Sequence, residues 1–214
     1  HAGFNTGRNV HREHPFATRD EQGRLRVGAA IGAKGDYLER AAELVRAGAD
    51  VIVIDIAHGH SVVMARAIEA FRKRFERVEL VAGNVATADG VRFLAERGVH
   101  GIKVGIGSGG GCTTRLNTNF GVPQVQALVD ARQAAGDRIP LIADGGVKRD
   151  GALVQALLFG GDTVMLGSAL AGTQETPGDR NTAEPSAARA TATAHASTRI
   201  SSSENGSLPV NGGC

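Results

Sequence analysis

The chain has 214 residues, about the length of one domain with an appendage, and its composition excludes several classes of protein. It carries 24 Lys and Arg against 22 Asp and Glu, a balance that argues against binding to nucleic acid or to a membrane surface. The two cysteines are too few for a disulfide framework, and the absence of tryptophan argues against a stacking platform for single-stranded nucleic acid. No apolar run approaches the roughly 20 residues of a membrane span, and no signal peptide is visible. We therefore expect a soluble, cytoplasmic protein that acts on a small molecule.

Three zones of different texture divide the chain. Residues 1–24 are polar and show no sustained period, so we expect an irregular segment. Residues 25–178 alternate apolar runs with amphipathic stretches. Residues 179–214 contain only three of the residues Val, Ile, Leu and Phe, and this segment cannot bury enough apolar area to offset its chain entropy. We expect it to be a disordered, low-complexity tail.

The middle zone repeats a unit of strand followed by helix. Short apolar runs predict strands at 25–31, 51–55, 80–83, 101–104, 141–144 and 163–166. Amphipathic stretches predict helices at 37–47, 62–75, 88–97, 122–135 and 151–159. The strand runs are continuously apolar, which is typical of parallel strands covered on both faces. Parallel strands joined by helices fit either a (β/α)₈ barrel or a doubly wound sheet.

Polar or glycine-rich residues follow every predicted strand, and their distribution separates the two folds. They stand at 32, 55–59, 84–87, 105–112, 144–146 and 167–168. In a barrel all the carboxyl ends of the strands converge on one mouth, whereas a doubly wound sheet concentrates its ligands at one switch point. The sequence therefore favours an α/β fold of the (β/α)₈ TIM-barrel type, apparently incomplete, because about six of its eight units are visible.

A glycine-dense loop at 105–111 follows the fourth predicted strand and leads to Cys112. Its glycines formally satisfy the dinucleotide fingerprint G-x-G-x-x-G, but a polar loop follows where that fingerprint requires an apolar helix. A loop of this kind also frees backbone groups to wrap an ion or a phosphate. Cys112 is either a nucleophile, favoured as a thiolate by Arg115, or a small buried side chain, and the residues leave both readings open.

The last two predicted strands end in Asp144-Gly145-Gly146 and in Gly167-Ser168. In barrels these two loops usually bind phosphate, because backbone amides approach an anion closely where no β-carbon intervenes. Asp144 has the chemistry to bind the hydroxyls of a ribose, and the alternative is a pair of ordinary turns. Asp55 and Asn84 end neighbouring strands and can each bond a ribose or an amide. His58 and His60 lack further ligands nearby in sequence, so a metal site is not favoured there.

Eight ordered segments resemble the IMP dehydrogenase/GMP reductase superfamily of (β/α)₈ barrels. They are LRVGAAIG (25–32), DIAHGHS (55–61), GNVAT (83–87), KVGIG (103–107), CTTR (112–115), GVPQ (121–124), ADGG (143–146) and MLGS (165–168). The resemblance covers residues 19–178, and the order of its motifs makes it specific for the superfamily. The chain looks like a truncated IMP dehydrogenase catalytic barrel.

The resemblance implies an enzyme of purine and GMP biosynthesis that oxidises IMP to XMP with NAD. Cys112 matches the nucleophile that attacks C2 of the purine and leaves a covalent thioimidate after hydride transfer, and Thr114 matches a threonine that assists there. Asp144 matches the ribose ligand, and the matching phosphate ligands are Gly145, Gly146, Gly167 and Ser168. The matching positions on the NAD side are Asp55, Asn84, Gly105, Ile106 and Gly107. The carbonyls of Gly107, Gly109 and Cys112 match a potassium site.

The same resemblance leaves alternatives and shows departures. GMP reductase, which deaminates GMP with NADPH, is the alternative within the superfamily, and a non-catalytic purine-nucleotide-binding fragment is the alternative outside catalysis. Intact members are homotetramers. Gly110 stands where the family has a phosphate-binding Ser, and Ser108 stands where it has Pro. The first two barrel strands have no counterpart, and the Tyr-Arg pair of the family's flap, whose Arg activates water, is missing because Tyr37 is the only tyrosine. We therefore expect impaired turnover.

Overall fold

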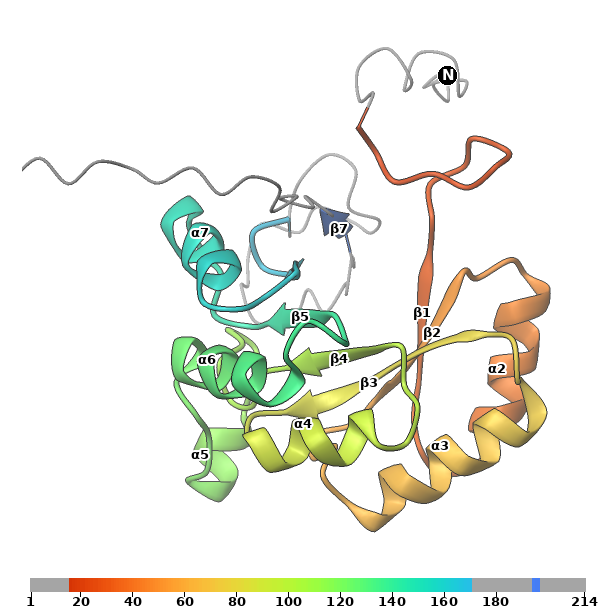
Figure 1. Ribbon diagram of the computed structural model, residues 1–214, viewed down its shortest axis with the longest axis horizontal. Coiled ribbons are helices and arrows are strands. Elements are labelled where there is room, and N and C mark those ends of the chain that lie inside the picture. The colour runs from red at the N-terminus through yellow and green to blue at the C-terminus, as the bar shows by residue number, and fades with distance from the viewer. Residues whose placement is uncertain (1–15, 171–193, 197–214) are drawn as a thin grey trace, which may run out of the picture.

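The computed structural model describes residues 16–170 and the backbone of residues 194–196 (Figure 1). Its strands are β1 (Gly28–Ile31), β2 (Val51–Asp55), β3 (Glu79–Val85), β4 (Gly101–Val104), β5 (Leu141–Asp144), β6 (Thr163–Leu166) and β7 (Ala194–Ala196). Its helices are α2 (Tyr37–Arg46), α3 (Val62–Arg74), α4 (Ala88–Ala95), α5 (Thr114–Thr118), α6 (Gln124–Ala135) and α7 (Asp150–Leu158). Strands and helices alternate from β1 to β4 and from α6 to β6, as the sequence predicts.

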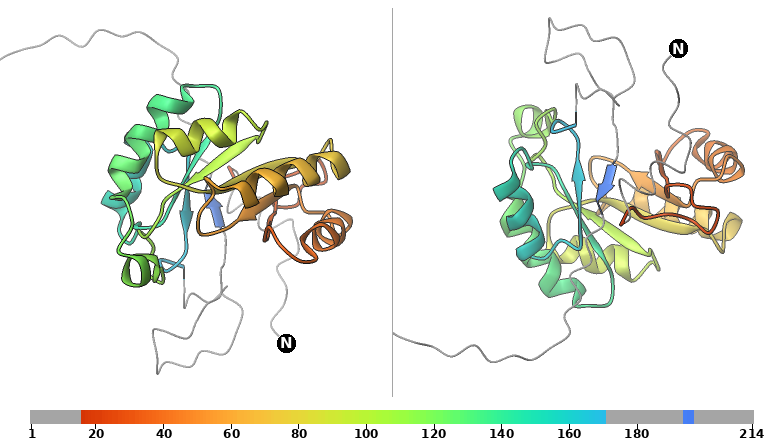
Figure 2. Two further views of the ribbon diagram at one scale, coloured as in Figure 1. Left: turned by 90° about the horizontal axis from the view of Figure 1, so that it is seen from below. Right: turned by 90° about the horizontal axis from the view of Figure 1, so that it is seen from above.

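The strand order decides between the two folds that the sequence allowed. The sheet runs β1-β2-β3-β4-β5-β6-β7, with each strand beside its neighbour in sequence. The first six strands are parallel, and β7 joins β6 antiparallel. A doubly wound sheet reverses its order at a switch point, and this one does not. Helices α2, α3, α4, α6 and α7 cover the outer face of the curved sheet (Figures 1 and 2). The six parallel strands therefore form an incomplete (β/α)₈ barrel, which we call the half-barrel.

Two local expectations were wrong. The polar stretch after Cys112 was expected to be a loop, but residues Thr114–Thr118 form helix α5. This helix has no buried residue, so it carries no apolar period, and it ends where Asn119 takes a left-handed conformation (φ 59°). The third strand extends two residues further than predicted, to Val85, which brings Asn84 into the sheet.

The alternation of side chains along each strand produces two apolar layers. Outward-facing residues such as Ile52, Leu80 and Ile102 are fully buried against the helices in the main core. Inward-facing Val53, Val81 and Ile142 form a second, smaller cluster inside the half-barrel. The same alternation places three charged residues on the inner face. Asp55 and Asp144 each lie two residues beyond an inward-facing residue of their own strand, and Lys103 pairs in register with inward-facing Ile142 of the neighbouring strand.

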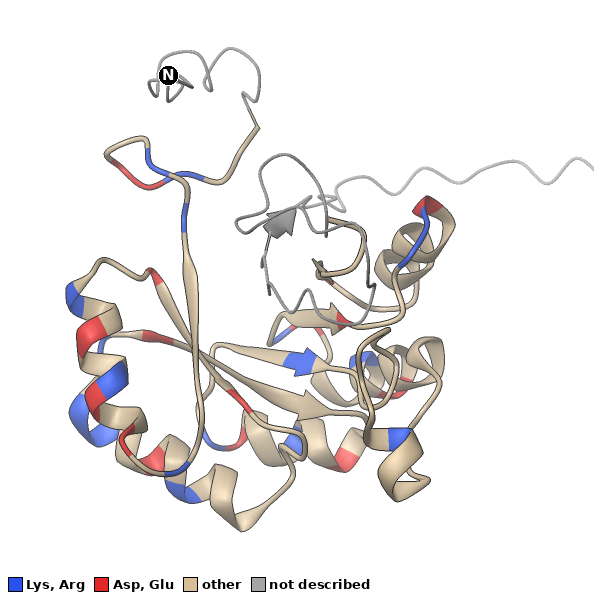
Figure 3. Cartoon of the chain, turned by 180° about the vertical axis from the view of Figure 1, so that it is seen from behind, with Lys and Arg blue, Asp and Glu red and all other residues tan. Residues whose placement is uncertain are grey.

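Charged side chains are plentiful on the outer helices and rare in the sheet (Figure 3). The six parallel strands contain four charged residues: Asp55, Glu79, Lys103 and Asp144. Glu79 begins β3 and pairs with His100 at the amino-terminal end of the strands. The other three gather on the inner face near the carboxyl ends of β2, β4 and β5, so the carboxyl end of the sheet is the candidate location of a polar site.

The ends of the chain lie largely outside the described residues. Of the segment 1–24, the described part forms a tight turn closed by an ion pair between Arg24 and Asp20 (2.7 Å) and an isolated bridge from Arg19 to Leu25. Of the segment 179–214, only the backbone of β7 is described, and the expected disorder of the rest of that tail stays a prediction. Among the described residues no helix is long and apolar enough to cross a membrane.

Candidate active site

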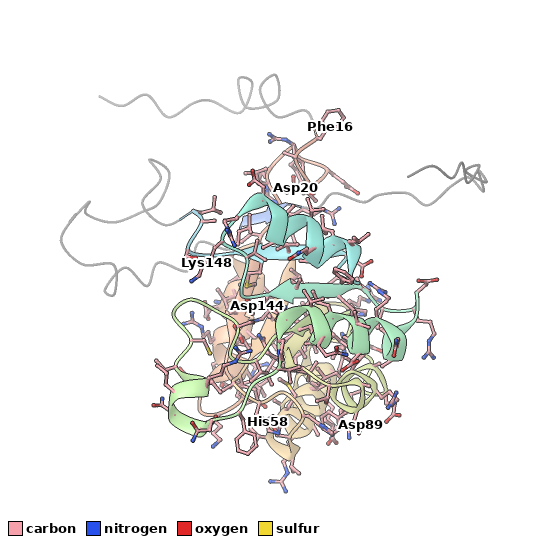
Figure 4. The ribbon with its side chains drawn as sticks, turned by 90° about the vertical axis from the view of Figure 1, so that its left-hand side faces the viewer. Phe16, Asp20, His58, Asp89, Asp144 and Lys148 are labelled. Carbon is pink, nitrogen blue, oxygen red and sulfur yellow. The ribbon has the colours of Figure 1, made fainter. Side chains whose placement is uncertain are left out.

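Two adjoining cavities open at the carboxyl ends of the strands, the end that faces the viewer in Figure 4. The first has a volume of about 420 Å³, and we call it the nucleophile cavity. Its lining residues are Asp55, Ile56, Ala57, Asn84, Lys103, Gly105, Ile106, Gly107, Ser108, Gly109, Cys112, Thr114, Asp144 and Gly145. The second, of about 200 Å³, we call the glycine cavity. Its lining residues are Gly109, Gly110, Gly111, Asp144, Gly145, Gly146, Val147, Lys148, Met165, Leu166, Gly167 and Ser168.

Lys103 organises the floor of the nucleophile cavity, and the strand register explains how. Asp55 of β2 pairs in register with Gly83 of β3, and Gly83 pairs with Lys103 of β4. A β-carbon at Gly83 would lie 2.7 Å from the Lys103 β-carbon, so only glycine fits between them. With no side chain in the way, the Lys103 ammonium reaches across β3 to Asp55 Oδ1 at 3.2 Å. Lys103 is also the one buried charged side chain among the described residues (2% exposed).

Asp144 completes this network from the last residue of β5. Its Oδ2 accepts a hydrogen bond from the Lys103 ammonium and another from Asn84 Nδ2 (2.8 Å). The same Asn84 amide nitrogen donates to the Gly105 carbonyl (2.7 Å), which fixes the side chain. Two polar atoms remain available: Asp144 Oδ1 accepts no bond from any described residue, and Asn84 Oδ1 is buried without a partner. A buried unpaired oxygen is costly unless a ligand satisfies it.

Cys112 lies at the rim of the same cavity, in the loop between β4 and α5, and is half-buried. Its Sγ lies 3.2 Å from Thr114 Oγ1. Hydrogen bonds from the Thr114 side chain and then from its backbone lower the pKa of the Cys112 thiol, with smaller help from the Gly107 backbone and the Arg115 charge. Partial burial raises the pKa of the thiol, but the net effect of all contributions is a lowered pKa. A thiolate is the nucleophilic form, so the loop favours reactivity at this sulfur.

The glycine-rich loop is held against β5 by contacts that leave little space. A β-carbon at Gly105 (φ +144°) would lie 1.9 Å from the Asp144 carbonyl oxygen. Ser108 Oγ lies within hydrogen-bond distance of Gln124 Oε1 (2.9 Å) and of the Asp144 carbonyl (3.2 Å). Gln124, at the start of α6, donates in turn to the Val104 carbonyl (2.9 Å). These bonds place the loop, and with it Cys112, opposite the end of β5.

The wall of the glycine cavity is largely backbone. Gly145 and Gly146 both have positive φ (101° and 81°), and a β-carbon at Gly145 would lie 2.4 Å from Ser108 Oγ. Within the described part of the chain, the amides of Gly146, Gly167 and Ser168 donate no hydrogen bond. Such unpaired amides around a small cavity are suited to an anion. The structure thus brings the predicted phosphate ligands together, next to the predicted ribose ligand Asp144.

The sequence analysis assigned no role to three residues that lie in or beside these cavities: Lys103, Gln124 and Lys148. The signal for Lys103 was a lone cation inside the apolar run of a strand. Of the two histidines that the sequence singled out, His60 packs on Phe93 with ring centroids 4.6 Å apart. No group of three or more metal-ligating side chains occurs within the described residues.

The potassium prediction rests on three backbone carbonyls. The carbonyl of Gly109 accepts a hydrogen bond from the Cys112 amide (3.1 Å), so part of its capacity is already used. Carbonyl cages that select potassium replace a whole hydration shell, and three oxygens from one loop do not. The residues described here do not by themselves fit that ion, and no chemical step below depends on it.

The half-barrel and the cavities at its carboxyl end define a class: a barrel-type α/β protein in which a half-buried cysteine shares a cavity with an aspartate and a glycine-rich wall. A sequence profile of the IMP dehydrogenase / GMP reductase domain matches residues 5–206. The chain belongs to the IMP dehydrogenase/GMP reductase family, whose members are NAD(P)-dependent oxidoreductases of IMP and GMP.

Individual members of the family show how similar the chain is to known proteins. The chain is 50% identical over 169 residues to the inosine-5'-monophosphate dehydrogenase of Aquifex aeolicus, covering 78% of this chain and 34% of that protein. It is 51% identical over 166 residues to the inosine-5'-monophosphate dehydrogenase of Escherichia coli K12, covering 77% of this chain and 34% of that protein. The crystal structure of GMP reductase C318A from Trypanosoma brucei is similar with a TM-score of 0.75 and 44% identity, covering 78% and 38%. A structure of the same protein contains guanosine 5'-monophosphate. The chain spans about a third of the length of these curated relatives.

Proposed function

We propose that this chain binds a purine nucleoside monophosphate and acts on IMP, as an IMP dehydrogenase-like oxidoreductase with impaired turnover. The observation that carries the proposal is the meeting of Cys112, Asp144 and the glycine cavity at one end of the sheet. Asp144 lines both cavities, so a ligand held by its ribose there extends its base toward Cys112 and its phosphate toward the unpaired amides. The identity of about half of the aligned residues to the dehydrogenases supports IMP as the substrate.

Ribose binding follows from the way in which Lys103 holds the carboxylates. Lys103 and Asn84 occupy one oxygen of Asp144, and the other oxygen is free to accept from a ribose hydroxyl. Because Lys103 is almost fully buried, the Asp144 carboxylate keeps a partner for its charge and stays aimed into the cavity. The phosphate then lies against Gly145, Gly146, Gly167 and Ser168, where the backbone offers donors and no side chain obstructs.

The chemistry belongs to Cys112. In the structure the Cys112 thiol donates to Thr114 Oγ1. Once ionised, the sulfur accepts the Thr114 hydroxyl hydrogen instead, which stabilises the thiolate that attacks C2 of the bound purine. Attack forms the carbon–sulfur bond, and loss of the C2 hydride to a bound NAD would leave the purine as a thioimidate on Cys112. Water would then cleave the carbon–sulfur bond to release XMP and the free thiol. Each carboxylate of the cavity has one oxygen paired with Lys103, and in this proposal the other oxygen binds a ribose hydroxyl, so neither is assigned as the general base for that water. The family's flap Arg, which activates that water, has no counterpart in the sequence, and losing a positioned base slows such a step by roughly 10²–10⁴-fold, which is the reason to expect impaired turnover.

The residues around Asn84 fit a nicotinamide nucleotide. The unpartnered Asn84 Oδ1 is an acceptor for a carboxamide N–H, and Asp55 Oδ2 is free to accept from a ribose hydroxyl. Gly105, Ile106 and Gly107 provide the adjoining wall of the cavity. When bound, NAD or NADP supplies the acceptor or donor of the hydride at the carbon that Cys112 attacks. The role of potassium and a homotetrameric assembly stay predictions.

GMP reduction with NADPH is the second candidate, because the similar structure of the GMP reductase contains guanosine 5'-monophosphate. Mixing the purified chain with IMP and NAD, and separately with GMP and NADPH, distinguishes the two by the absorbance of the reduced dinucleotide. We expect a slow, stoichiometric rise with IMP and NAD and a mass adduct on Cys112. A fall with GMP and NADPH favours the reductase. Binding of IMP without any adduct supports a non-catalytic nucleotide binder.

A further inference from the structure

Lys148 is the one cation among the residues that line the glycine cavity, and it plays no part in the site described so far. It follows Val147 in the loop between β5 and α7, and its side chain is exposed. Within the described part of the chain its ammonium has no hydrogen-bond or ion-pair partner. The acid of the same cavity, Asp144, is already paired with Lys103. Among the described residues, the cavity therefore holds one positive charge that no acidic side chain pairs with.

The end of the Lys148 side chain lies beside Gly110, which lines the same cavity. A β-carbon at Gly110 would lie 3.5 Å from Lys148 Cε and 3.8 Å from its Nζ. The end of the lysine therefore lies over the place where a side chain at position 110 would begin. Gly110 does not have a positive φ, so its conformation does not require glycine. A β-carbon at position 110 would therefore make ordinary van der Waals contact with the end of Lys148, and a side chain there would share the space around the ammonium.

The order of residues along the two cavities identifies the ligand group that faces Lys148. Cys112 lies at one end, Asp144 is shared, and Lys148 lies in the glycine cavity; Figure 4 labels Asp144 and Lys148 on the face that carries the cavities. A nucleoside monophosphate has base, ribose and phosphate in the same order. Unpaired backbone amides and one unpaired ammonium together suit a dianionic phosphate monoester better than a neutral group.

We propose that Lys148 binds the phosphate of the nucleotide and takes the place of a side-chain hydroxyl at position 110. The proposal rests on the proposed function, since it assumes that a purine nucleoside monophosphate binds here. A lysine contributes a full charge where a serine contributes a neutral donor, so this chain should discriminate a nucleotide from its nucleoside chiefly through Lys148.

Calorimetric titration of the purified chain with IMP and with inosine tests this assignment. Lys148→Met should weaken IMP binding on the order of tenfold and leave inosine binding unchanged, because hydrogen bonds to charged groups are the strong ones. Lys148→Arg should retain most of the IMP affinity. Arg149→Met removes the same charge one residue away, outside the cavity, and should have no effect on either ligand.

A second variant connects the lysine with the glycine. Gly110→Ser in the Lys148→Met background should restore part of the lost IMP affinity by supplying a hydroxyl in the vacated space. If Lys148→Met leaves IMP affinity unchanged, or weakens IMP and inosine equally, Lys148 does not bind the phosphate although nucleotide binding stands. If the unchanged chain binds no IMP at all, the proposed function fails and this assignment fails with it.

Discussion

The nucleophile cavity and the glycine cavity share Gly109, Asp144 and Gly145, yet they are built in different ways. The first is defined by side chains, and its geometry depends on one buried lysine between two carboxylates. The second is defined by backbone, with amides that donate to no described residue and, among the described residues, a single exposed cation. The first should therefore respond strongly to a change of charge or volume, and the second should tolerate small side chains at its open positions.

Removing the nucleophile should give the largest effect, and only in the first cavity. Cys112→Ala should abolish the covalent adduct with IMP and NAD and any stoichiometric reduction of NAD, because no other thiol lies in the described part of the chain. IMP affinity should persist, since Asp144 and the glycine cavity are untouched. Intact-mass spectrometry and calorimetry measure the two quantities, and an adduct in the variant would place the reactive group elsewhere.

Adding a methyl group tests the difference in packing between the cavities. Gly105→Ala places a β-carbon 1.9 Å from the Asp144 carbonyl at φ +144° and should reduce the free energy of unfolding on the order of 4 kcal/mol. Gly146→Ala meets nothing closer than 3.6 Å, so only its left-handed backbone (φ +81°) opposes it, at about 1–2 kcal/mol.

Gly167→Ala is the control for this pair, since a β-carbon there meets nothing within 4 Å and the backbone has no positive φ. Its free energy of unfolding should equal that of the unchanged chain. Urea denaturation followed by circular dichroism measures all three. Equal losses at Gly105 and Gly146 would remove the distinction between a closely packed and an open wall.

The buried charge provides the next test. Lys103→Met leaves Asp55 and Asp144 facing each other without a cation and should lower the free energy of unfolding by about 3 kcal/mol. This lies at the low end for a broken buried pair because Asp55 and Asp144 are 44% and 21% exposed, and water takes up part of the charge. Lys73→Met, which breaks an exposed pair with Glu69 on α3, should change stability by less than about 1 kcal/mol. Similar losses for both lysines would show that Lys103 is not essential to the floor of the cavity.

The sequence predicted the order of strands and helices because the fold repeats one unit whose apolar runs are easily recognised. It also predicted that polar residues gather at one end, since parallel strands place their carboxyl ends together. Lys103 escaped assignment because its role depends on register: the row Asp55, Gly83, Lys103 exists only once three strands are aligned. Lys148 escaped it because nothing in the sequence shows that its side chain lies over Gly110.

Helix α5 was missed for a different reason. Its residues Thr114–Thr118 carry no apolar face and none is buried, so the sequence shows no hydrophobic period that would predict a helix there. This short helix nevertheless matters to the site, because its first residue supplies the hydroxyl beside the nucleophile.

The smallest predicted effect concerns that hydroxyl. Thr114→Val removes the hydrogen bond that does most to lower the pKa of the Cys112 thiol, so the pKa should rise toward its ordinary value. The thiolate is lost as the pH falls through the pKa, and a higher pKa moves that loss to higher pH. Alkylation by iodoacetamide at neutral pH should then slow by roughly threefold to tenfold, with the difference vanishing at high pH where both thiols are ionised. Thr113→Val makes the same chemical change at the preceding residue, whose side chain caps no backbone group of α5, and should leave the alkylation profile unchanged. A profile that shifts equally for both variants would assign the effect to the helix rather than to the Thr114 hydroxyl.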